Sequence, residues 1–197
     1  MTDFVDPYLD PSTGILRNLV GARKRADLDQ AEADLVTARS VDLVSAQIKP
    51  TRDLTELRAI HGYLFQDVYG WAGHLRSVDI RKNTDGGEFF VPASLIERAS
   101  GFAFGELAGD GHLQGMDRPR FIERIAYHYD QLNHIHPFRE GNGRAQRAFW
   151  DRVAFDAGHR LDWTAATGPV NDAASQLAAA ARDLSLLTAM FDQVVAP

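Results

Sequence analysis

Apolar residues recur three and four positions apart along most of this 197-residue chain. This spacing places them on one face of an α-helix, and another element of the fold has to cover that face. The sequence therefore predicts an all-α protein. The first expected helix spans 27–47, and the second has Thr51 as its N-cap and Asp53 in its first turn. The buried positions expected for these two helices are Leu28, Ala31, Leu35, Ala38, Asp42, Leu54, Leu57, Ile60, Leu64, Phe65 and Val68.

Four more helices follow from the same periodicity, with a glycine-containing loop over 109–117 between the first two. Prolines and capping residues indicate their ends, because proline fits the first turn of a helix and disfavours the helical conformation in the residue before it. The first of these helices begins at a capping box of Ser94 and Glu97, and the second begins at Pro119 and ends near Ile135, before Pro137. The third begins at Asn142 or Gly143 and ends near Ala157, and the fourth runs from Ala173 to about Val195. Their expected buried positions include Leu95, Ala99, Phe102, Ala103, Phe121, Ile125, Tyr129, Leu132, Leu177, Ala180, Leu184, Leu187, Phe191 and Val194.

One segment departs from the helical pattern. Val78 and Ile80 alternate with polar residues, and Gly86-Gly87 separates them from the apolar run 89–91. Alternation interrupted by a glycine pair is typical of a β-hairpin. An isolated hairpin is marginally stable, so we expect this one, over 78–91, to rest on the helices.

Charge and residue usage exclude several classes of function. The formal net charge of −6 argues against a surface that neutralises many nucleic-acid phosphates. Without cysteine, the chain has no disulfide, thiol nucleophile or cysteine zinc site. No run reaches the roughly 20 apolar residues of a membrane span, and the N-terminal region lacks the apolar block of a signal peptide. We therefore expect a cytoplasmic protein that binds neither a membrane nor nucleic acid directly.

A turn between two expected helices carries the strongest chemical signal. Gly141-Asn142-Gly143 allows positive φ angles and a close approach of the backbone to a ligand, because two of its positions lack a Cβ atom. Successive amides in such a turn, followed by the free N–H groups of a helix start, form a site for anions. Arg144 and Arg147 are three positions apart, so both project from the same face of that helix. Two guanidinium groups beside these amides suit a polyphosphate better than a single carboxylate.

Two further side chains next to this turn can act on a bound phosphate. Glu140 is the one acid of the turn, and it either neutralises an arginine or holds Mg²⁺ together with phosphate oxygens. His136, at the entrance of the loop, can accept a proton near neutral pH. Together these residues describe the attack of a hydroxyl on a metal-bound nucleotide phosphate. Zinc held by His128, His134 and His136 is a weaker alternative, because their spacing lacks the HExxH pattern.

The segment 136–147 resembles the signature of the Fic family, written HPFx(D/E)GNGRxxR, at every fixed position. The sequences at 69–73 (Tyr-Gly-Trp-Ala-Gly), at 161–163 (Leu-Asp-Trp) and at 8–18 are also similar to Fic proteins. The resemblance implies a Fic-fold helical bundle with a short β-hairpin flap beside the active-site loop. It further implies a single Fic domain over 1–197, with a core at about 51–195 and an N-terminal helical extension.

The resemblance also implies an activity and a role for each signature residue. The chain would be a protein adenylyltransferase, which uses Mg²⁺ and transfers AMP from ATP to a hydroxyl side chain of a target protein. The implied roles are His136 as general base, Glu140 as the Mg²⁺ ligand, Gly141, Asn142 and Gly143 as the cradle of the α- and β-phosphates, Arg144 at the β- and γ-phosphates and Arg147 at the γ-phosphate.

Two features bear on the target and on the type of reaction. The flap over 78–91 would pair with a segment of the target protein as an added strand, and Lys82 and Asn83 on it are candidate contacts to the nucleotide or the target. In the Doc branch of the family a lysine stands at the position of Gly143, ATP binds in the reverse direction, and the enzyme phosphorylates. The glycine of this chain therefore favours transfer of AMP over transfer of phosphate.

Regulation and partners follow from the resemblance as well. Fic enzymes are commonly inhibited by a helix with the motif (S/T)xxxE(G/N), whose glutamate pairs with the second signature arginine. In this chain the one glutamate followed by glycine or asparagine is Glu140, inside the signature itself. The resemblance thus implies a toxin inhibited in trans by a small antitoxin, whose glutamate would meet Arg147. The expected target offers a serine, threonine or tyrosine hydroxyl, and the family suggests the ATPase subunits of DNA gyrase and topoisomerase IV.

Other functions stay open from the sequence. A site of this kind could transfer phosphate or another nucleotide, or it could bind a nucleotide and a partner without turnover. His136 and Glu140 argue against a non-catalytic binding module, because such a module needs no general base. A DNA-binding regulator is a further alternative, and the acidic net charge argues against it.

Overall fold

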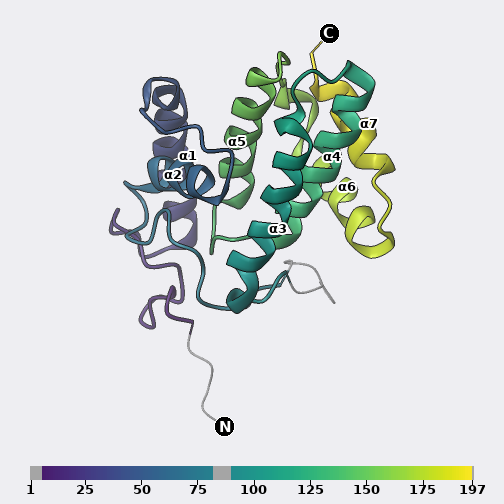
Figure 1. Cartoon of the computed structure of the whole chain (residues 1–197). Helices are drawn as coiled ribbons and strands as arrows, with labels where there is room; N and C mark the ends of the chain where they lie inside the picture. Colours follow the sequence, from purple (N-terminus) through teal and green to yellow (C-terminus); the bar gives the residue numbers. More distant parts are fainter. Residues whose placement is uncertain (1–5, 82–89, 197) are drawn as a thin grey trace.

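The computed structural model describes residues 6–81 and 90–196, which form seven α-helices joined by loops and short 3₁₀ turns (Figure 1). The α-helices are α1 (Arg25–Asp42), α2 (Leu54–Phe65), α3 (Ile96–Gly109), α4 (Arg118–Ile135), α5 (Asn142–Asp156), α6 (Gly168–Ala181) and α7 (Ser185–Val194). The 3₁₀ turns are η1 (Leu43–Ser45), η2 (Ala93–Leu95), η3 (Gly111–Leu113) and η4 (Trp163–Ala165). The described residues contain single-residue β-bridges but no longer strand, so the prediction of an all-α fold is confirmed.

Helix α5 lies at the centre of the fold, between α2 on one side and α4 on the other (Figure 1). Helix α1 packs on α2, α3 and α7 pack on α4, and α6 pairs with α7. Burying a large apolar side chain in such contacts contributes about 1.5–3 kcal/mol. The largest side chains in this core are Trp150 and Phe149 of α5, Phe65 of α2, Phe121 of α4, Phe191 of α7 and Phe138 of the loop before α5. Within the described ranges, no helix is both long enough and apolar enough to cross a lipid bilayer.

The two helices that flank the signature follow the prediction closely. Asp117 caps α4 by accepting a hydrogen bond from the N–H of Arg120 (3.0 Å), and Pro119 stands in the first turn. Helix α4 ends at Ile135, and α5 begins at Asn142, one residue after a left-handed glycine. Phe121, Ile125, Tyr129 and Leu132 are buried, as predicted.

The N-cap of α2 is Asp53, not Thr51 as predicted. The carboxylate of Asp53 accepts hydrogen bonds from the N–H groups of Thr55 (2.8 Å) and Glu56 (3.3 Å), and from the hydroxyl of Thr51. The helix starts later because Arg52 has a left-handed backbone (φ 56°), which is incompatible with a helical first turn at that position.

The prediction for α3 was wrong in its cap, and its predicted buried face was confirmed at Ala103 but not at Leu95 or Phe102. The capping box of Ser94 and Glu97 does not form at the start of α3, where a 3₁₀ turn precedes the helix and no side chain caps it. Leu95 and Phe102 are 45% and 64% exposed. A 3₁₀ turn advances the chain with a shorter period than an α-helix, so a stripe counted from Leu95 is displaced. The residues that α3 buries are Ile96, Ser100, Ala103, Phe104 and Leu107.

The predicted last helix over 173–195 is two helices, and the first of them begins earlier, at Gly168. Arg182 has a left-handed backbone (φ 53°) and ends α6, and the carboxylate of Asp183 then accepts a hydrogen bond from the N–H of Ser185 (2.8 Å). The sequence Asp183-Leu184-Ser185 favours a local turn, but the apolar spacing continues across it, so the prediction did not include the break. Ala180 is exposed as a consequence, whereas Leu187, Phe191 and Val194 are buried as predicted.

Helix α1 is shorter than predicted, and its buried stripe is rotated. It ends at Asp42, which is exposed, as is Ala38. The buried residues are Leu28, Glu32 and Val36, so a charged residue occupies a position that the apolar pattern did not assign to the core.

The predicted β-hairpin over 78–91 is not shown. Its central part, with Lys82 and Asn83, lies outside the described residues. The described ends of this segment are joined by a hydrogen bond from the N–H of Phe90 to the carbonyl of Ile80 (3.2 Å). We refer to residues 78–91 as the flap segment.

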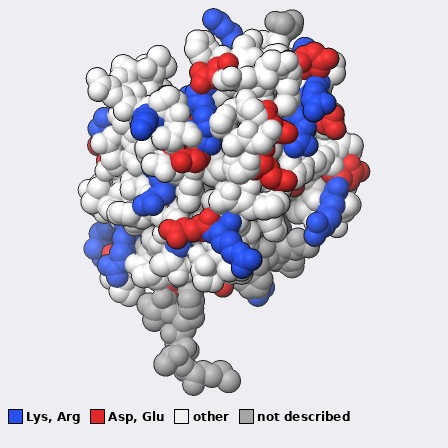
Figure 2. Space-filling model, in the orientation of Figure 1, with Lys and Arg blue, Asp and Glu red and all other residues white. Residues whose placement is uncertain are grey.

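Acidic and basic side chains are interspersed on the face that Figure 2 shows. Neither sign gathers there into one broad area. This face therefore lacks the continuous basic surface with which proteins neutralise the phosphates of a duplex.

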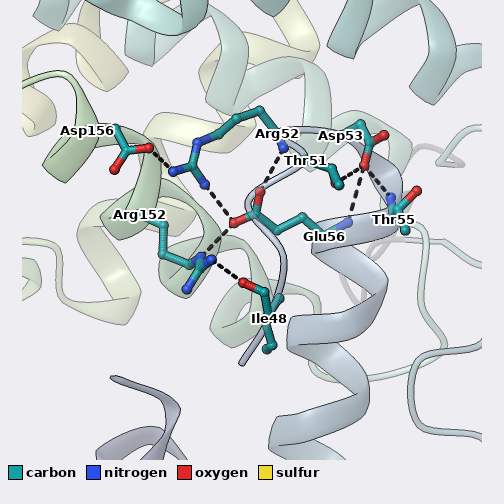
Figure 3. A network of polar contacts seen from close by, with 8 residues as sticks. All are labelled: Ile48, Thr51, Arg52, Asp53, Thr55, Glu56, Arg152 and Asp156. Carbon is teal, nitrogen blue, oxygen red and sulfur yellow. Dashed lines mark hydrogen bonds and ion pairs between the residues drawn. The ribbon is translucent and has the colours of Figure 1, made fainter. Parts of the chain in front are cut away.

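A buried ionic network joins the start of α2 to the end of α5 (Figure 3). The fully buried carboxylate of Glu56 accepts hydrogen bonds from the backbone N–H of Arg52 (2.7 Å), from Arg52 Nη1 (2.7 Å) and from Arg152 Nε (2.6 Å). Arg52 also pairs with Asp156, and Arg152 donates to the carbonyl of Ile48 (2.9 Å). A buried carboxylate is tolerated when its charge is paired and its lone pairs are used, and both conditions hold here. The network fixes the loop before α2 against α5, whose other end carries the signature.

Replacing the carboxylate of this network should destabilise the protein strongly. Glu56→Ala removes the buried carboxylate that pairs with both Arg52 and Arg152, and we expect a loss of about 3–5 kcal/mol in the free energy of unfolding. The control is Arg25→Ala, which breaks the exposed pair of Arg25 with Asp29 (2.8 Å) and should cost less than about 0.5 kcal/mol. Urea denaturation of both variants measures the difference, and similar losses would contradict this account.

Candidate active site

His136 ends α4 in a left-handed conformation (φ 48°, ψ 62°). Its backbone N–H still donates to the carbonyl of Leu132 (3.0 Å), while its half-buried imidazole stacks on the ring of Phe90, with 3.8 Å between ring centroids. A left-handed backbone costs a residue with a side chain roughly 1–2 kcal/mol, so it persists only where the surroundings hold it. The chain turns out of α4 at this residue, which presents the histidine at the entrance of the signature loop.

The buried side chain of Arg76 holds this turn in place. Its backbone N–H donates to the carbonyl of Pro137 (2.9 Å), and its guanidinium donates to four more carbonyl groups. Burial lowers the pKa of this guanidinium, and the carbonyl oxygens replace the water that the group has lost. Those four carbonyls belong to Ile135 (3.2 Å), His136 (2.8 Å), Val78 (2.8 Å) and Val91. One side chain therefore joins the end of α4 to both ends of the flap segment.

The side chain of Asn142 closes the signature loop. Its Oδ1 accepts a hydrogen bond from the N–H of Phe138 (2.8 Å), and its Nδ2 donates to the carbonyl of the same residue (2.8 Å). Asn142 is buried, and Phe138 is fully buried. The amide side chain thus serves the loop itself, which leaves the backbone N–H of Asn142 as the group that can face a ligand.

The two glycines of the loop differ in their constraint. Gly141 has φ 79°, and a Cβ atom there would lie 2.2 Å from Cζ of Phe65. Gly143 is helical, and a Cβ atom there would meet nothing within 4 Å. Of the two glycines that allow a positive φ angle in this turn, Gly141 adopts one and Gly143 does not. Gly141 is required by the fold, whereas Gly143 leaves open space at the start of α5 where a ligand can approach the backbone.

His61 of α2 supports the signature loop through a hydrogen bond to the carbonyl of Glu140. It was not among the residues predicted for the site. Its Nδ1 accepts a hydrogen bond from the N–H of Gly73 (2.8 Å), so its Nε2–H donates to the carbonyl of Glu140 (3.0 Å). Its ring is fully buried and stacks between Phe65 (4.7 Å between centroids) and Phe138 (3.9 Å). Burial, with a smaller contribution from the positive charge of Arg144, lowers the pKa of His61 from 6.5 to about 4. The imidazole is therefore neutral at physiological pH.

Glu140 lies where it can hold a cation next to bound phosphates. Its Oε1 accepts a hydrogen bond from the N–H of Gly141 (2.9 Å) and lies 3.9 Å from Arg144, and the side chain is partly exposed. Mg²⁺ commonly binds through one or two carboxylates together with phosphate oxygens and water, which fits this arrangement. Within the described ranges, no three His, Asp or Glu side chains are placed to hold a metal by themselves. His128, His134 and His136 are not brought together as a metal site; His128 is instead bonded to Asp110 (2.8 Å).

Arg144 and Arg147 line the same pocket, as their spacing predicted. The pocket has a volume of about 330 Å³ and is bounded on its far side by Leu43 and Val44 of η1. Arg147 lies over the ring of Trp163 and donates to the carbonyl of Ala166 (2.8 Å). Arg144 points toward Glu32 of α1, so the two guanidinium groups extend from α5 toward different neighbours.

This chain is similar to several known proteins. A model described as Fic/DOC family matches residues 51–154. The chain is 36% identical over 190 residues to a probable protein adenylyltransferase Fic of Escherichia coli (strain K12), an alignment that covers 96% of this chain and 92% of that protein. It is 40% identical over 158 residues to protein adenylyltransferase VbhT of Bartonella schoenbuchensis, covering 80% of this chain but 32% of VbhT. The crystal structure of BepC from Bartonella tribocorum with bound AMPPNP has a TM-score of 0.86 at 25% identity, over 96% of each chain.

This chain belongs to the Fic/DOC family. Its fold is the helical Fic fold, and it is an enzyme of the nucleotidyltransferase class, both as predicted. The two curated relatives are named protein adenylyltransferases, and the structure of BepC contains a bound ATP analogue. The family therefore supports nucleotide binding and transfer of AMP, while the roles of the individual residues rest on the geometry above.

The two glycines should respond differently to the same substitution. Gly141→Ala introduces a Cβ atom against Phe65 at a left-handed position, and we expect a loss of at least about 2 kcal/mol in the free energy of unfolding. Gly143→Ala should leave stability unchanged or raise it by up to about 1 kcal/mol, because alanine favours a helix. Denaturant titration of both variants tests this, and equal effects would contradict the different constraints at the two positions.

His61 should make the stability of the protein depend on pH. Its folded pKa lies below its unfolded value, so the unfolded state binds the extra proton and stability is lost as pH falls from 6.5 toward about 4. A pKa shift of this size corresponds to a loss of roughly 3 kcal/mol in the free energy of unfolding between pH 6.5 and about 4. His61→Gln keeps a hydrogen-bond donor but cannot be protonated, so its stability should fall less steeply. Unfolding measured at pH 7.5, 5.5 and 4.5 gives both slopes, and parallel slopes would exclude His61 as the source.

Proposed function

We propose that this chain transfers AMP from Mg²⁺-bound ATP to a hydroxyl side chain of a target protein. The observation that carries the proposal is the arrangement around the signature loop. A left-handed His136 stands at its entrance, open space lies at Gly143, and Arg144 and Arg147 line one pocket. Glu140 adds a carboxylate 3.9 Å from Arg144. This set of groups matches the requirements of nucleophilic attack on a nucleotide phosphate.

In the proposed reaction, each residue of the site has one role. His136 accepts the proton of the target hydroxyl while the hydroxyl oxygen attacks the α-phosphorus of ATP. A bond forms between this oxygen and the α-phosphorus, the bond from the α-phosphorus to the oxygen that bridges to the β-phosphate breaks, and pyrophosphate leaves. The backbone N–H groups at 141–143, with Arg144 and Arg147, bind the phosphate oxygens and stabilise the charge that develops on them. Glu140 would hold Mg²⁺ together with the phosphates, and the ion would supply further positive charge.

A groove beside the histidine supports a protein as the acceptor. It has a volume of about 740 Å³, is mainly apolar, and shares the side chain of Phe90 with the stacking contact to His136. An extended segment of a target protein can bind an apolar groove and bring its hydroxyl to the base. The adjoining flap segment, including Lys82 and Asn83, is proposed to contact the target or the nucleotide. The groove is lined by Phe90, Val91, Pro92, Leu95, Ala99, Phe102 and Ile135, among others.

We further propose that the chain is a bacterial toxin, active in the cytoplasm and inhibited by a small antitoxin. The pocket of Arg144 and Arg147 is bordered by Val44, which is 94% exposed. An antitoxin helix that covers this apolar residue could bring a glutamate to Arg147 and exclude the γ-phosphate. The proposed targets are the ATPase subunits of DNA gyrase and topoisomerase IV.

Labelled ATP tests the proposed reaction directly. The protein is incubated with Mg²⁺, a bacterial lysate and ATP labelled at either the α- or the γ-phosphate. We expect protein bands labelled from α-labelled ATP alone, because AMP is transferred and pyrophosphate leaves. Label from γ-labelled ATP would show a kinase, and no label with either nucleotide, in a sample that also contains purified gyrase and topoisomerase IV, would contradict the proposal.

A histidine variant identifies the base in the same assay. His136→Ala should lower the rate of labelling by at least about 100-fold, since general-base catalysis contributes about 10²–10⁴. It should bind ATP as tightly as the parent, because the phosphate-binding groups are unchanged. The control His74→Ala removes an exposed histidine outside the site and should retain full activity. Equal labelling by the two variants would remove His136 from the mechanism.

A further inference from the structure

Helix α1 contributes a carboxylate to the signature site. Glu32 is 8% exposed and lies on the buried stripe of α1, between Leu28 and Val36. Burying a carboxylate is costly unless hydrogen bonds and an opposite charge compensate for the loss of water. Helix α1 lies outside the residues 51–154 that match the family model, so this carboxylate adds to the groups of the signature.

Each oxygen of Glu32 has a partner. Oε2 accepts a hydrogen bond from the hydroxyl of Tyr69, and Oε1 pairs with Nη2 of Arg144. Tyr69 is buried and stacks on Trp71, with 4.3 Å between ring centroids, so its hydroxyl is fixed. Burial and the hydrogen bond to Glu32 both raise the pKa of Tyr69, so the phenol stays protonated and donates. Glu32 is thereby held by a rigid donor on one side and holds Arg144 on the other.

The guanidinium of Arg144 is held by Glu32 at one edge and is exposed at the other. Its guanidinium lies 4.8 Å from the centre of the Phe65 ring, the same ring that lies against Gly141. The side chain is nevertheless 39% exposed, and it lines the pocket described above. A guanidinium carries five N–H donors in a planar fork, so a carboxylate can hold one edge while the other binds a phosphate. Fixing the group in advance reduces the entropy lost when a ligand binds.

We propose that Glu32 is a positioning residue for nucleotide binding: through its ion pair, with Tyr69 behind it, it orients Arg144 toward the polyphosphate of ATP. This inference rests on the proposed function, because it assumes that Arg144 binds phosphates beyond the α-phosphate. It assigns to helix α1 an indirect part in the binding of substrate, through Arg144.

The test measures the dissociation constants of Mg²⁺-ATP and of AMP for the whole chain. Glu32→Ala should weaken ATP binding about tenfold and leave AMP binding unchanged, because AMP lacks the phosphates that Arg144 contacts. Glu32→Gln should stay within about threefold of the parent, since its amide can accept from Arg144 and donate to Tyr69. In an Arg144→Ala background, Glu32→Ala should add less than about twofold.

Several outcomes would overturn the inference. If Glu32→Ala weakens ATP binding equally in the parent and in the Arg144→Ala variant, Glu32 only docks α1. If Glu32→Ala or Glu32→Gln binds ATP more tightly than the parent, Glu32 competes with the phosphates for Arg144. If Glu32→Ala does not fold, Tyr69→Phe removes the fixed donor without altering a charge. It should weaken ATP binding about threefold, and no change would contradict the inference. A parent that does not bind ATP would refute the proposed function, whereas weakening by Arg144→Ala without an effect at Glu32 would refute this inference alone.

Discussion

The site depends on the hydrogen bonds that the buried guanidinium of Arg76 donates to four carbonyl groups. The guanidinium binds the carbonyls of Ile135 and His136 at the end of α4 and those of Val78 and Val91 at the ends of the flap segment. These bonds stabilise the left-handed backbone of His136, which would otherwise be unfavourable. They also give His136 and the adjoining flap segment a common support. The position of the histidine is thus set by a side chain sixty residues earlier in the chain.

A second support acts on the loop from α2. The neutral imidazole of His61 binds the carbonyl of Glu140, and its ring lies between Phe65 and Phe138. Phe65 in turn lies against Gly141 on one side and under Arg144 on the other. Because these rings are buried and stacked, a change at any one of them displaces the loop and the arginine together. The signature loop is therefore supported directly by the hydrophobic core.

The sequence predicted the parts of this structure that depend on local pattern. The limits of α4 and α5, with a start of α5 at Asn142 or Gly143, follow from prolines, glycines and apolar spacing, and the signature identified the loop residues. Arg76, His61 and Glu32 were missed, because their roles come from partners 60, 79 and 112 residues away, and nothing in the neighbouring sequence marks them. The break at Arg182 was missed because apolar spacing continues on both sides of it.

The pairing of Glu32 with Arg144 bears on where the functional unit of this protein begins. A fragment that started at residue 51 would contain every position of the matched family segment and the whole signature. It would still lack α1, leaving the hydroxyl of Tyr69 and the guanidinium of Arg144 without the carboxylate that joins them. The smallest piece that keeps the site intact is therefore longer than the piece that its signature defines, and α1 has to be retained when the protein is shortened or fused to another.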